Sequence, residues 1–225
     1  EGNGGGLSVS ERAGSVADPH HRGGRCARFE DGVYLRQHLR RNRARGKGIF
    51  EDATLTTYVH EQAEGCPHGP RAAMLVLPGG GYAYCSDREA EPIALAFIPF
   101  GMNAFVLDYS VAPNKFPTQI REVAAAMELL YEKQDEWHID TDKITIIGFS
   151  AGGHLAAHYS TSFDIPEVRE VFPESKAVNG SILSYPVIIA EEGLCHQGSF
   201  KNLTGEYPLS EENYKRFSLE NCVSE

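Results

Sequence analysis

Ile144-Thr145-Ile146-Ile147-Gly148-Phe149-Ser150-Ala151-Gly152 is the stretch of this 225-residue chain that decides the fold. Its first four residues form an apolar, mostly β-branched run that is typical of a buried strand. The run that follows, from Ala151 to Ala157, consists mostly of small residues and is typical of a closely packed helix. The segment therefore predicts a strand and a helix joined by a sharp turn, with Ser150 in the turn.

The two glycines around Ser150 complete a G-x-S-x-G pattern, which is typical of a nucleophile turn. The serine of such a turn has a strained backbone, and a side chain at Gly148 or Gly152 would collide with neighbouring backbone. A serine hydroxyl attacks a carbonyl group only when a base removes its proton and when donors stabilise the oxyanion. We therefore predict that Ser150 is a nucleophile. The alternative is a glycine-rich turn whose serine has no chemical role.

A second glycine-rich segment, Leu77-Pro78-Gly79-Gly80-Gly81-Tyr82, follows the strand-like run Ala72–Val76. Consecutive glycines after a strand allow backbone N–H groups to point into a cleft, where they can stabilise a developing negative charge. Taken alone, the segment is equally consistent with a flexible turn. Together with Ser150 it predicts an oxyanion hole.

In these segments the chain resembles the α/β-hydrolase family, in the acetyl-esterase and acetylxylan-esterase-like branch related to hormone-sensitive-lipase-type enzymes. The resemblance covers about residues 50–225 and rests on four blocks in the family's order: Pro78 to Tyr82, Asp108 to Pro113 with Phe116-Pro117, Gly148 to His154, and Leu183 to Val187. It implies that Ser150 is the nucleophile and that the N–H groups of Gly80, Gly81 and Ala151 form the oxyanion hole. Pro78 stands where many lipases of the family have histidine.

The same resemblance implies a serine carboxylic ester hydrolase that forms an acyl-enzyme and needs no cofactor and no metal. The expected substrates are small acyl esters, in particular acetyl esters of carbohydrates. Tyr82 is predicted to contact the substrate, although an aromatic residue here could equally form a wall of the fold. Two other functions stay open, namely a peptidase of the same fold and a non-catalytic binding module.

The triad acid and the triad histidine, which follow the nucleophile in this family, are not identified in the sequence. After Ser150 the chain has one aspartate and three histidines, namely Asp164, His154, His158 and His196. The first two histidines project over the helix that Ser150 begins, so we expect them to pack. His196 lies in a predicted loop without a preceding strand that ends in a carboxylate. We therefore expect the sequence to be a fragment whose acid and base lie beyond Glu225, and expect this chain to be nearly inactive.

Strand-like and helix-like segments alternate through the remaining chain. The predicted strands are Thr54–His60, Ala72–Leu77, Asn103–Tyr109, Lys143–Phe149 and Val178–Tyr185, and the predicted helices are Glu89–Phe100, Thr118–Gln134 and Ser150–Thr161. This alternation predicts an α/β fold with a doubly wound, mostly parallel sheet and helices on both faces. We expect the sheet to be incomplete at its C-terminal end, so that an apolar edge near Ile182 is exposed and lowers solubility.

The charge divides the chain into residues 1–48 and residues 49–225. The first part has ten Lys and Arg against five Asp and Glu, a charge of about +5, whereas the whole chain carries −10. We expect residues 1–48 to be a disordered, basic Gly/Arg-rich arm, and residues 49–225 to be a partial α/β-hydrolase domain. The negative body argues against general nucleic-acid binding, and a basic run of this kind is typical of a solvated tail.

The five cysteines are scattered without a C-x-x-C pair, which favours free thiols in a reducing, cytoplasmic compartment. The first residues lack the apolar core of a signal peptide, and no apolar stretch reaches the length of a membrane span. The expected partner is therefore a small-molecule ester. The histidines lack zinc-ligand spacing, and the sequence does not indicate an oligomeric state.

Overall fold

A computed structural model describes residues 34–40, 53–61 and 69–223 of the chain. Its six strands form one sheet with the order β1-β2-β4-β3-β5-β6. The strands are β1 (Tyr34–Arg40), β2 (Thr54–His60), β3 (Arg71–Leu77), β4 (Asn103–Asp108), β5 (Ile139–Phe149) and β6 (Gly180–Ser184). The pairs β4/β3, β3/β5 and β5/β6 are parallel, whereas β1 pairs antiparallel with β2 and β2 with β4. The predicted mostly parallel sheet is confirmed.

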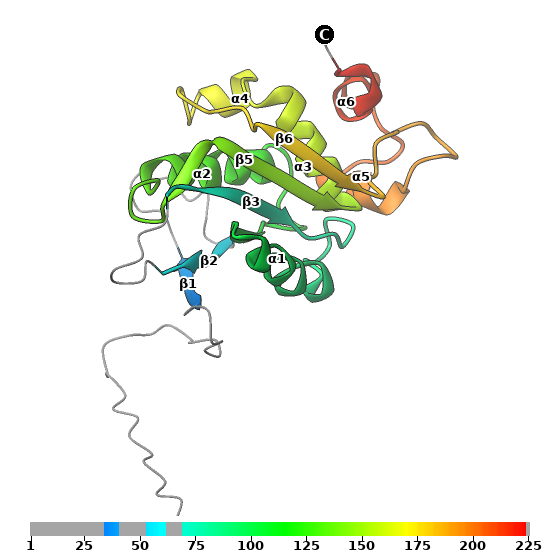
Figure 1. Cartoon of the computed structure of the whole chain (residues 1–225). Coiled ribbons are helices and arrows are strands. Elements are labelled where there is room, and N and C mark those ends of the chain that lie inside the picture. The colour runs from blue at the N-terminus through cyan, green and yellow to red at the C-terminus, as the bar shows by residue number, and fades with distance from the viewer. Residues whose placement is uncertain (1–33, 41–52, 62–68, 224–225) are drawn as a thin grey trace, which may run out of the picture.

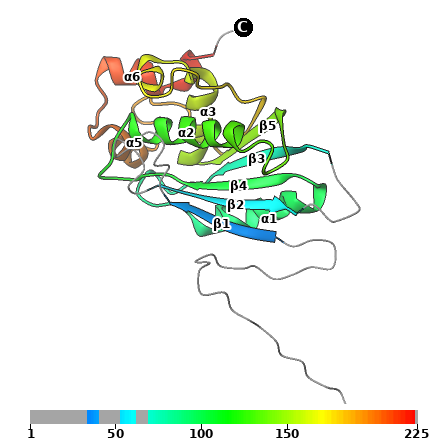
Figure 2. The same ribbon diagram turned by 90° about the vertical axis from the view of Figure 1, so that its left-hand side faces the viewer.

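Helices cover both faces of this sheet (Figure 2). They are α1 (Glu91–Phe97), α2 (Thr118–Glu132), α3 (Ala151–Ser162), α4 (Pro166–Arg169), α5 (Gln197–Thr204) and α6 (Glu211–Phe217), with the short 3-10 turns η2 (Asp87–Glu89), η3 (Ile98–Phe100) and η4 (Leu219–Asn221). Helix α1 lies on one face, and α2 and α3 lie on the other together with α5 and α6. Within the described ranges, no helix has the length and apolarity that crossing a bilayer requires.

The apolar core is divided by the sheet into two clusters. In β3, Leu75 and Leu77 belong to the larger cluster under α2 and α3, whereas Met74 and Val76 belong to the smaller cluster under α1. Successive side chains of a strand point to opposite faces, so an uninterrupted apolar strand fills both clusters. This explains why the central strands are apolar runs without alternation.

Most predicted strand and helix bounds agree with the structure within a few residues. The strand before Ser150 is longer than predicted, since β5 begins at Ile139. The predicted helix Glu89–Phe100 is divided into η2, α1 and η3. Helices α5 and α6 follow β6 in a region for which the sequence predicted no helix, and α5 lies at the carboxyl ends of β3 and β5 (Figure 1).

The two ends of the sheet differ from each other. Strand β1 falls within residues 1–48, where the sequence predicted disorder; the rest of that arm lies outside the described residues. Low hydrophobicity led to that prediction, but strand pairing uses main-chain groups that any sequence supplies. At the other end, β6 has no further strand beside it among the described residues, and Ile182 and Leu183 are 41% and 40% exposed. The expected apolar edge is therefore present in the part of the chain that the structure describes.

Candidate active site

Ser150 occupies the turn between β5 and α3 with an unusual backbone. Its φ is 51° and its ψ is −115°, a conformation that non-glycine residues rarely adopt. The turn is held from both sides, because the Ser150 N–H donates to the Ser184 carbonyl oxygen at 3.0 Å and the Ser150 carbonyl oxygen accepts from the Val187 N–H at 3.2 Å. The strained strand-to-helix turn that the sequence predicted is therefore present.

Two glycines allow this turn to pack against its neighbours. A Cβ atom on Gly148 would lie 2.2 Å from the Gly152 carbonyl oxygen. A Cβ atom on Gly152 would lie 2.3 Å from the Leu77 carbonyl oxygen, at the end of β3. Both distances are far below van der Waals contact, so only glycine fits at either position. The predicted collision with backbone is confirmed.

The glycine loop after β3 lies beside Ser150. Gly80 and Gly81 have φ values of 135° and 65°, which favour glycine. Both loop carbonyl oxygens accept hydrogen bonds within the protein. The Gly80 oxygen accepts from the Ala83 N–H of the same loop at 3.0 Å, and the Gly81 oxygen accepts from Asn202 Nδ2 of α5 at 2.9 Å. Within the described residues, the N–H groups of Gly80 and Gly81 have no hydrogen-bond acceptor. These two groups are therefore free to bind a ligand.

Ala151 supplies a third backbone N–H group. It is the first residue of α3 and is completely buried. The first N–H groups of a helix have no acceptor within the helix, and no acceptor for this one occurs in the described parts of the chain. It directly follows Ser150, so the three N–H groups predicted for the oxyanion hole lie on the two segments that meet at the nucleophile turn.

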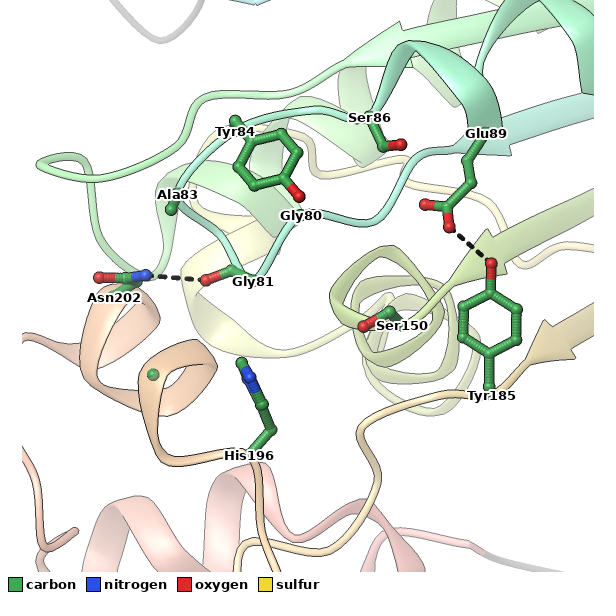
Figure 3. A pocket seen from close by; sticks show the side chains of 11 residues that line it. Gly80, Gly81, Ala83, Tyr84, Ser86, Glu89, Ser150, Tyr185, His196 and Asn202 are labelled. Atoms are coloured by element: carbon green, nitrogen blue, oxygen red, sulfur yellow. Dashed lines mark hydrogen bonds between the residues drawn. The ribbon is translucent and has the colours of Figure 1, made fainter.

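Ser150, Gly80 and Gly81 line one pocket of about 450 Å³ (Figure 3). The rest of its lining comes from segments far apart in the sequence. Tyr84, Ser86 and Glu89 follow the glycine loop, and Tyr185 follows β6. His196 is the residue before α5, and Asn202 lies on α5. The Glu89 carboxylate accepts a hydrogen bond from the Tyr185 hydroxyl at 2.5 Å, across the side of the pocket opposite α5.

The Tyr82 side chain is not part of this lining, which corrects the expectation of a substrate contact. It is 1% exposed, and its hydroxyl donates to Nδ1 of His154 at 2.8 Å. The three consecutive positive φ values of Gly80, Gly81 and Tyr82 turn its ring toward α3. Tyr82 is therefore a wall of the fold, and the exposed rings of Tyr84 and Tyr185 lie at the pocket instead.

His154 and His158 pack in the core, as their helical positions predicted. Both are almost completely buried. Burial lowers the pKa of His154 to about 4 and that of His158 to about 3. Nδ1 of His154 accepts from Tyr82, so Nε2 carries the proton and donates to the Phe217 carbonyl oxygen at 3.1 Å. Neither ring lines the pocket.

His196 lines the pocket, which the sequence did not indicate. Its Nδ1 accepts from the Ser199 N–H at 3.3 Å and lies 2.8 Å from the Ser199 hydroxyl. A neutral imidazole that accepts at Nδ1 carries its proton on Nε2. In this arrangement the Nε2 atom of His196 can donate a hydrogen bond. Across the described residues, the Ser150 hydroxyl itself has no hydrogen-bond partner.

The described part of the chain contains no second candidate site built from a reactive thiol or from a cluster of metal ligands. Cys85, Cys195 and Cys222 are free, and Cys26 and Cys66 lie outside the described residues. Burial, with a smaller effect of Asp108, raises the pKa of the Cys85 thiol to about 12, which leaves it protonated and a poor nucleophile. No three His, Cys, Asp or Glu side chains gather as a metal site within the same residues.

Known proteins share this arrangement of segments. The family model BD-FAE matches residues 66–188, which is more than half of the chain. Endo-1,4-beta-xylanase B of Butyrivibrio fibrisolvens is 38% identical over 165 residues, which are 69% of this chain and 25% of that protein. Acetylxylan esterase of Xylanibacter ruminicola is 29% identical over 70% of this chain and 32% of its own length. The chain thus spans about a quarter to a third of these relatives.

Two solved structures are similar over most of the chain. An alpha/beta hydrolase enzyme from a deep-sea metagenome library is 34% identical with a TM-score of 0.60, over 82% of this chain and 66% of that one. The acetyl ester-xyloside bifunctional hydrolase from Caldicellulosiruptor lactoaceticus is 31% identical with a TM-score of 0.64, over 76% of this chain and 62% of that one. The chain belongs to the BD-FAE family and has the α/β-hydrolase fold.

Proposed function

We propose that this protein is a serine carboxylic ester hydrolase that acts on small acyl esters through an acyl-enzyme. One observation carries the proposal: Ser150, on a strained turn, lines the same pocket as Gly80 and Gly81, whose N–H groups have no acceptor in the described residues. This combination is the one that acyl transfer requires, namely a serine hydroxyl next to preorganised donors. Similarity to esterases, an acetylxylan esterase among them, supports the proposal.

The proposed reaction has two steps. The Ser150 Oγ atom attacks the ester carbonyl carbon while its proton passes to a general base, and the N–H groups of Gly80, Gly81 and Ala151 hold the oxyanion. The tetrahedral intermediate then expels the alcohol, which takes up the proton, and leaves an acyl-serine. Water, deprotonated by the same base, attacks the acyl-serine and releases the carboxylic acid and the free Ser150 hydroxyl.

The general base is not assigned to a described residue. His154 and His158 are buried away from the pocket, and no hydrogen bond joins His196 to Ser150 in the described part of the chain. Loss of a base costs several orders of magnitude in turnover, whereas an oxyanion hole and binding alone retain about 10³-fold catalysis over water. The assay of this chain is therefore run with and without an external base.

We propose acetyl esters of carbohydrates as the substrate class. The pocket combines two exposed tyrosine rings, Tyr84 and Tyr185, with hydrogen-bonding side chains of His196 and Asn202. Flat aromatic rings can contact the apolar faces of a sugar, and the polar groups around them can bind its hydroxyls. Similarity to an acetylxylan esterase and to an acetyl ester-xyloside bifunctional hydrolase supports the same class.

Hydrolysis of p-nitrophenyl acetate tests the proposed function. The full chain, Ser150→Ala and the control Ser160→Ala are each assayed with and without added imidazole, which can act as an external base. Ser160 lies on α3 outside the pocket, where its hydroxyl bonds to the Ala156 carbonyl oxygen. We expect hydrolysis above the Ser150→Ala background that imidazole increases and that Ser160→Ala retains. Equal rates for wild type and Ser150→Ala under both conditions would refute the assignment, and a preference for an aminoacyl amide would favour a peptidase.

A further inference from the structure

A single carboxylate, that of Glu89, connects the glycine loop with the segment after β6. Glu89 ends the 3-10 turn η2 and is half-buried at the pocket. Its Oε2 atom accepts the Gly79 N–H at 2.8 Å, and its Oε1 atom accepts the Tyr185 hydroxyl at 2.5 Å. An acidic residue just before a helix usually caps it. Helix α1 has no side-chain cap, so both oxygens of Glu89 serve the pocket instead.

Gly79 packs against both Glu89 and the turn at Ser150. A Cβ atom on Gly79 would be 2.6 Å from Glu89 Oε2, 2.8 Å from the Phe149 carbonyl oxygen and 3.1 Å from Ser150 Cβ. The carboxylate and the turn at Ser150 therefore both pack closely against Gly79, in the space that a Cβ atom would fill. The next residues in the chain, Gly80 and Gly81, carry the free N–H groups. A displacement of the carboxylate thus changes the position of those groups relative to Ser150.

The Glu89 carboxylate also holds the Tyr185 side chain in place. It has a φ of 37°, which is strained for a tyrosine, and its ring is 65% exposed. Apart from a tilted ring contact with Phe149 at 5.9 Å, the hydrogen bond to Glu89 is the anchor of the ring in the described structure. That bond raises the pKa of the Tyr185 phenol, which keeps it a donor. Figure 3 shows the two side chains meeting above Ser150 on one side of the pocket.

We propose that Glu89 is a positioning residue: it fixes the oxyanion loop through Gly79 and holds Tyr185 as the opposite wall of the substrate pocket. Glu89 acts by holding these groups in place and not by its charge. A negative charge beside an oxyanion hole repels the oxyanion and therefore disfavours it. A neutral side chain with the same shape can keep both hydrogen bonds. Its amide oxygen accepts from Gly79, and its amide N–H₂ group donates to the Tyr185 oxygen. Only the catalytic part of this inference, the effect of Glu89 on ester hydrolysis, rests on the proposed function.

Amide hydrogen exchange of the full chain, resolved by ¹H–¹⁵N spectra, tests the geometric part. We compare wild type with Glu89→Ala, Glu89→Gln, Tyr185→Phe and the control Asp87→Ala, an exposed carboxylate on the same 3-10 turn. A hydrogen bond to a charged group contributes about 1.5–3 kcal/mol, so exchange at Gly79 should become about 10–100 times faster in Glu89→Ala. The Gly80 and Gly81 signals should shift in Glu89→Ala and return in Glu89→Gln. Unchanged glycine signals in Glu89→Ala would overturn the proposal.

Ester hydrolysis with added imidazole tests the catalytic part on the same variants. Glu89→Ala should lower kcat about 10–100-fold, as loss of a group that orients a catalytic donor does, and Glu89→Gln should have the wild-type kcat or a higher one. Tyr185→Phe should raise KM with kcat unchanged. Equal loss of kcat in Glu89→Gln and Glu89→Ala would show a role for the charge and overturn the proposal.

If wild type lacks activity that depends on Ser150, the proposed function fails, and the exchange data alone decide the role of Glu89. If Glu89→Ala does not fold, a loss of kcat in Glu89→Gln, or an unchanged KM in Tyr185→Phe, overturns the proposal.

Discussion

His158→Phe tests whether the histidines of α3 are neutral packing side chains rather than a catalytic pair. Burial lowers the pKa of His158 to about 3, whereas an unfolded chain titrates this side chain near its ordinary value of about 6.5. As the pH falls from 6.5 to 5, the unfolded chain binds a proton here and the folded chain does not. The stabilisation by the neutral ring is therefore complete above pH 6.5 and is lost progressively toward pH 3.

The size of the effect follows from this difference in pKa. One pKa unit corresponds to about 1.4 kcal/mol, so His158 removes about 2 kcal/mol from the free energy of unfolding between pH 6.5 and 5. Phenylalanine does not titrate, and its ring can keep the contacts with Phe116 and Phe217, whose ring centroids lie 5.7 and 5.5 Å away. His158→Phe should therefore lose about 2 kcal/mol less than wild type over this pH range.

Urea unfolding at pH 7.5, 6.5 and 5 measures the difference. Trp137 is the single tryptophan and is buried, so its fluorescence reports the transition. Tyr159→Phe is the matched control, because it changes another buried ring of α3 that does not titrate in this range. It should keep the wild-type pH dependence. The same pH dependence in wild type and His158→Phe would refute the reasoning, because it would mean that His158 binds a proton equally well in the folded and the unfolded chain.

Other substitutions test the packing around the site and the edge of the sheet. Gly152→Ala puts a Cβ atom 2.3 Å from a carbonyl oxygen at the end of β3 and should lower the free energy of unfolding by about 1–3 kcal/mol or more, whereas Gly69→Ala, with open space around it, should not; urea unfolding compares the two. Tyr82→Phe leaves Nδ1 of His154 buried without its donor, so thermal unfolding should show a loss of about 1–3 kcal/mol. The exposed edge at β6 should make the chain self-associate, and Leu183→Lys should shift sedimentation profiles toward monomer; a monomeric wild type would contradict this expectation.

The sequence was sufficient for the central fold because its signals there are local. The β-branched run before Gly148 and the small residues after Ser150 specify a strand, a turn and a helix within one segment, and the close contacts of Gly148 and Gly152 explain their composition. Strand β1 was not predicted because polar and basic residues, Arg36, Gln37, His38 and Arg40, interrupt its few apolar ones. Its pairing with β2 uses main-chain groups that composition does not reveal.

Much of the pocket could not be predicted because its contacts join distant residues. The bond between Glu89 and Tyr185 spans 96 positions, and that between Asn202 and Gly81 spans 121. No local pattern marks these partners. The direction of the Tyr82 side chain likewise depends on a run of positive φ values, which the glycines permit but do not specify. The sequence therefore predicted the strained turn at Ser150 and the close contacts of Gly148 and Gly152, but not the side chains that line the pocket.

Labelling with a fluorophosphonate probe tests most directly whether Ser150 is a nucleophile that faces the glycine loop. The full chain is incubated with the probe and imidazole, digested and mapped by mass spectrometry, beside Ser150→Ala. We predict a single adduct on the peptide that contains Ser150 and no adduct in the variant. No adduct in wild type, or the same adduct in both proteins, would contradict the account.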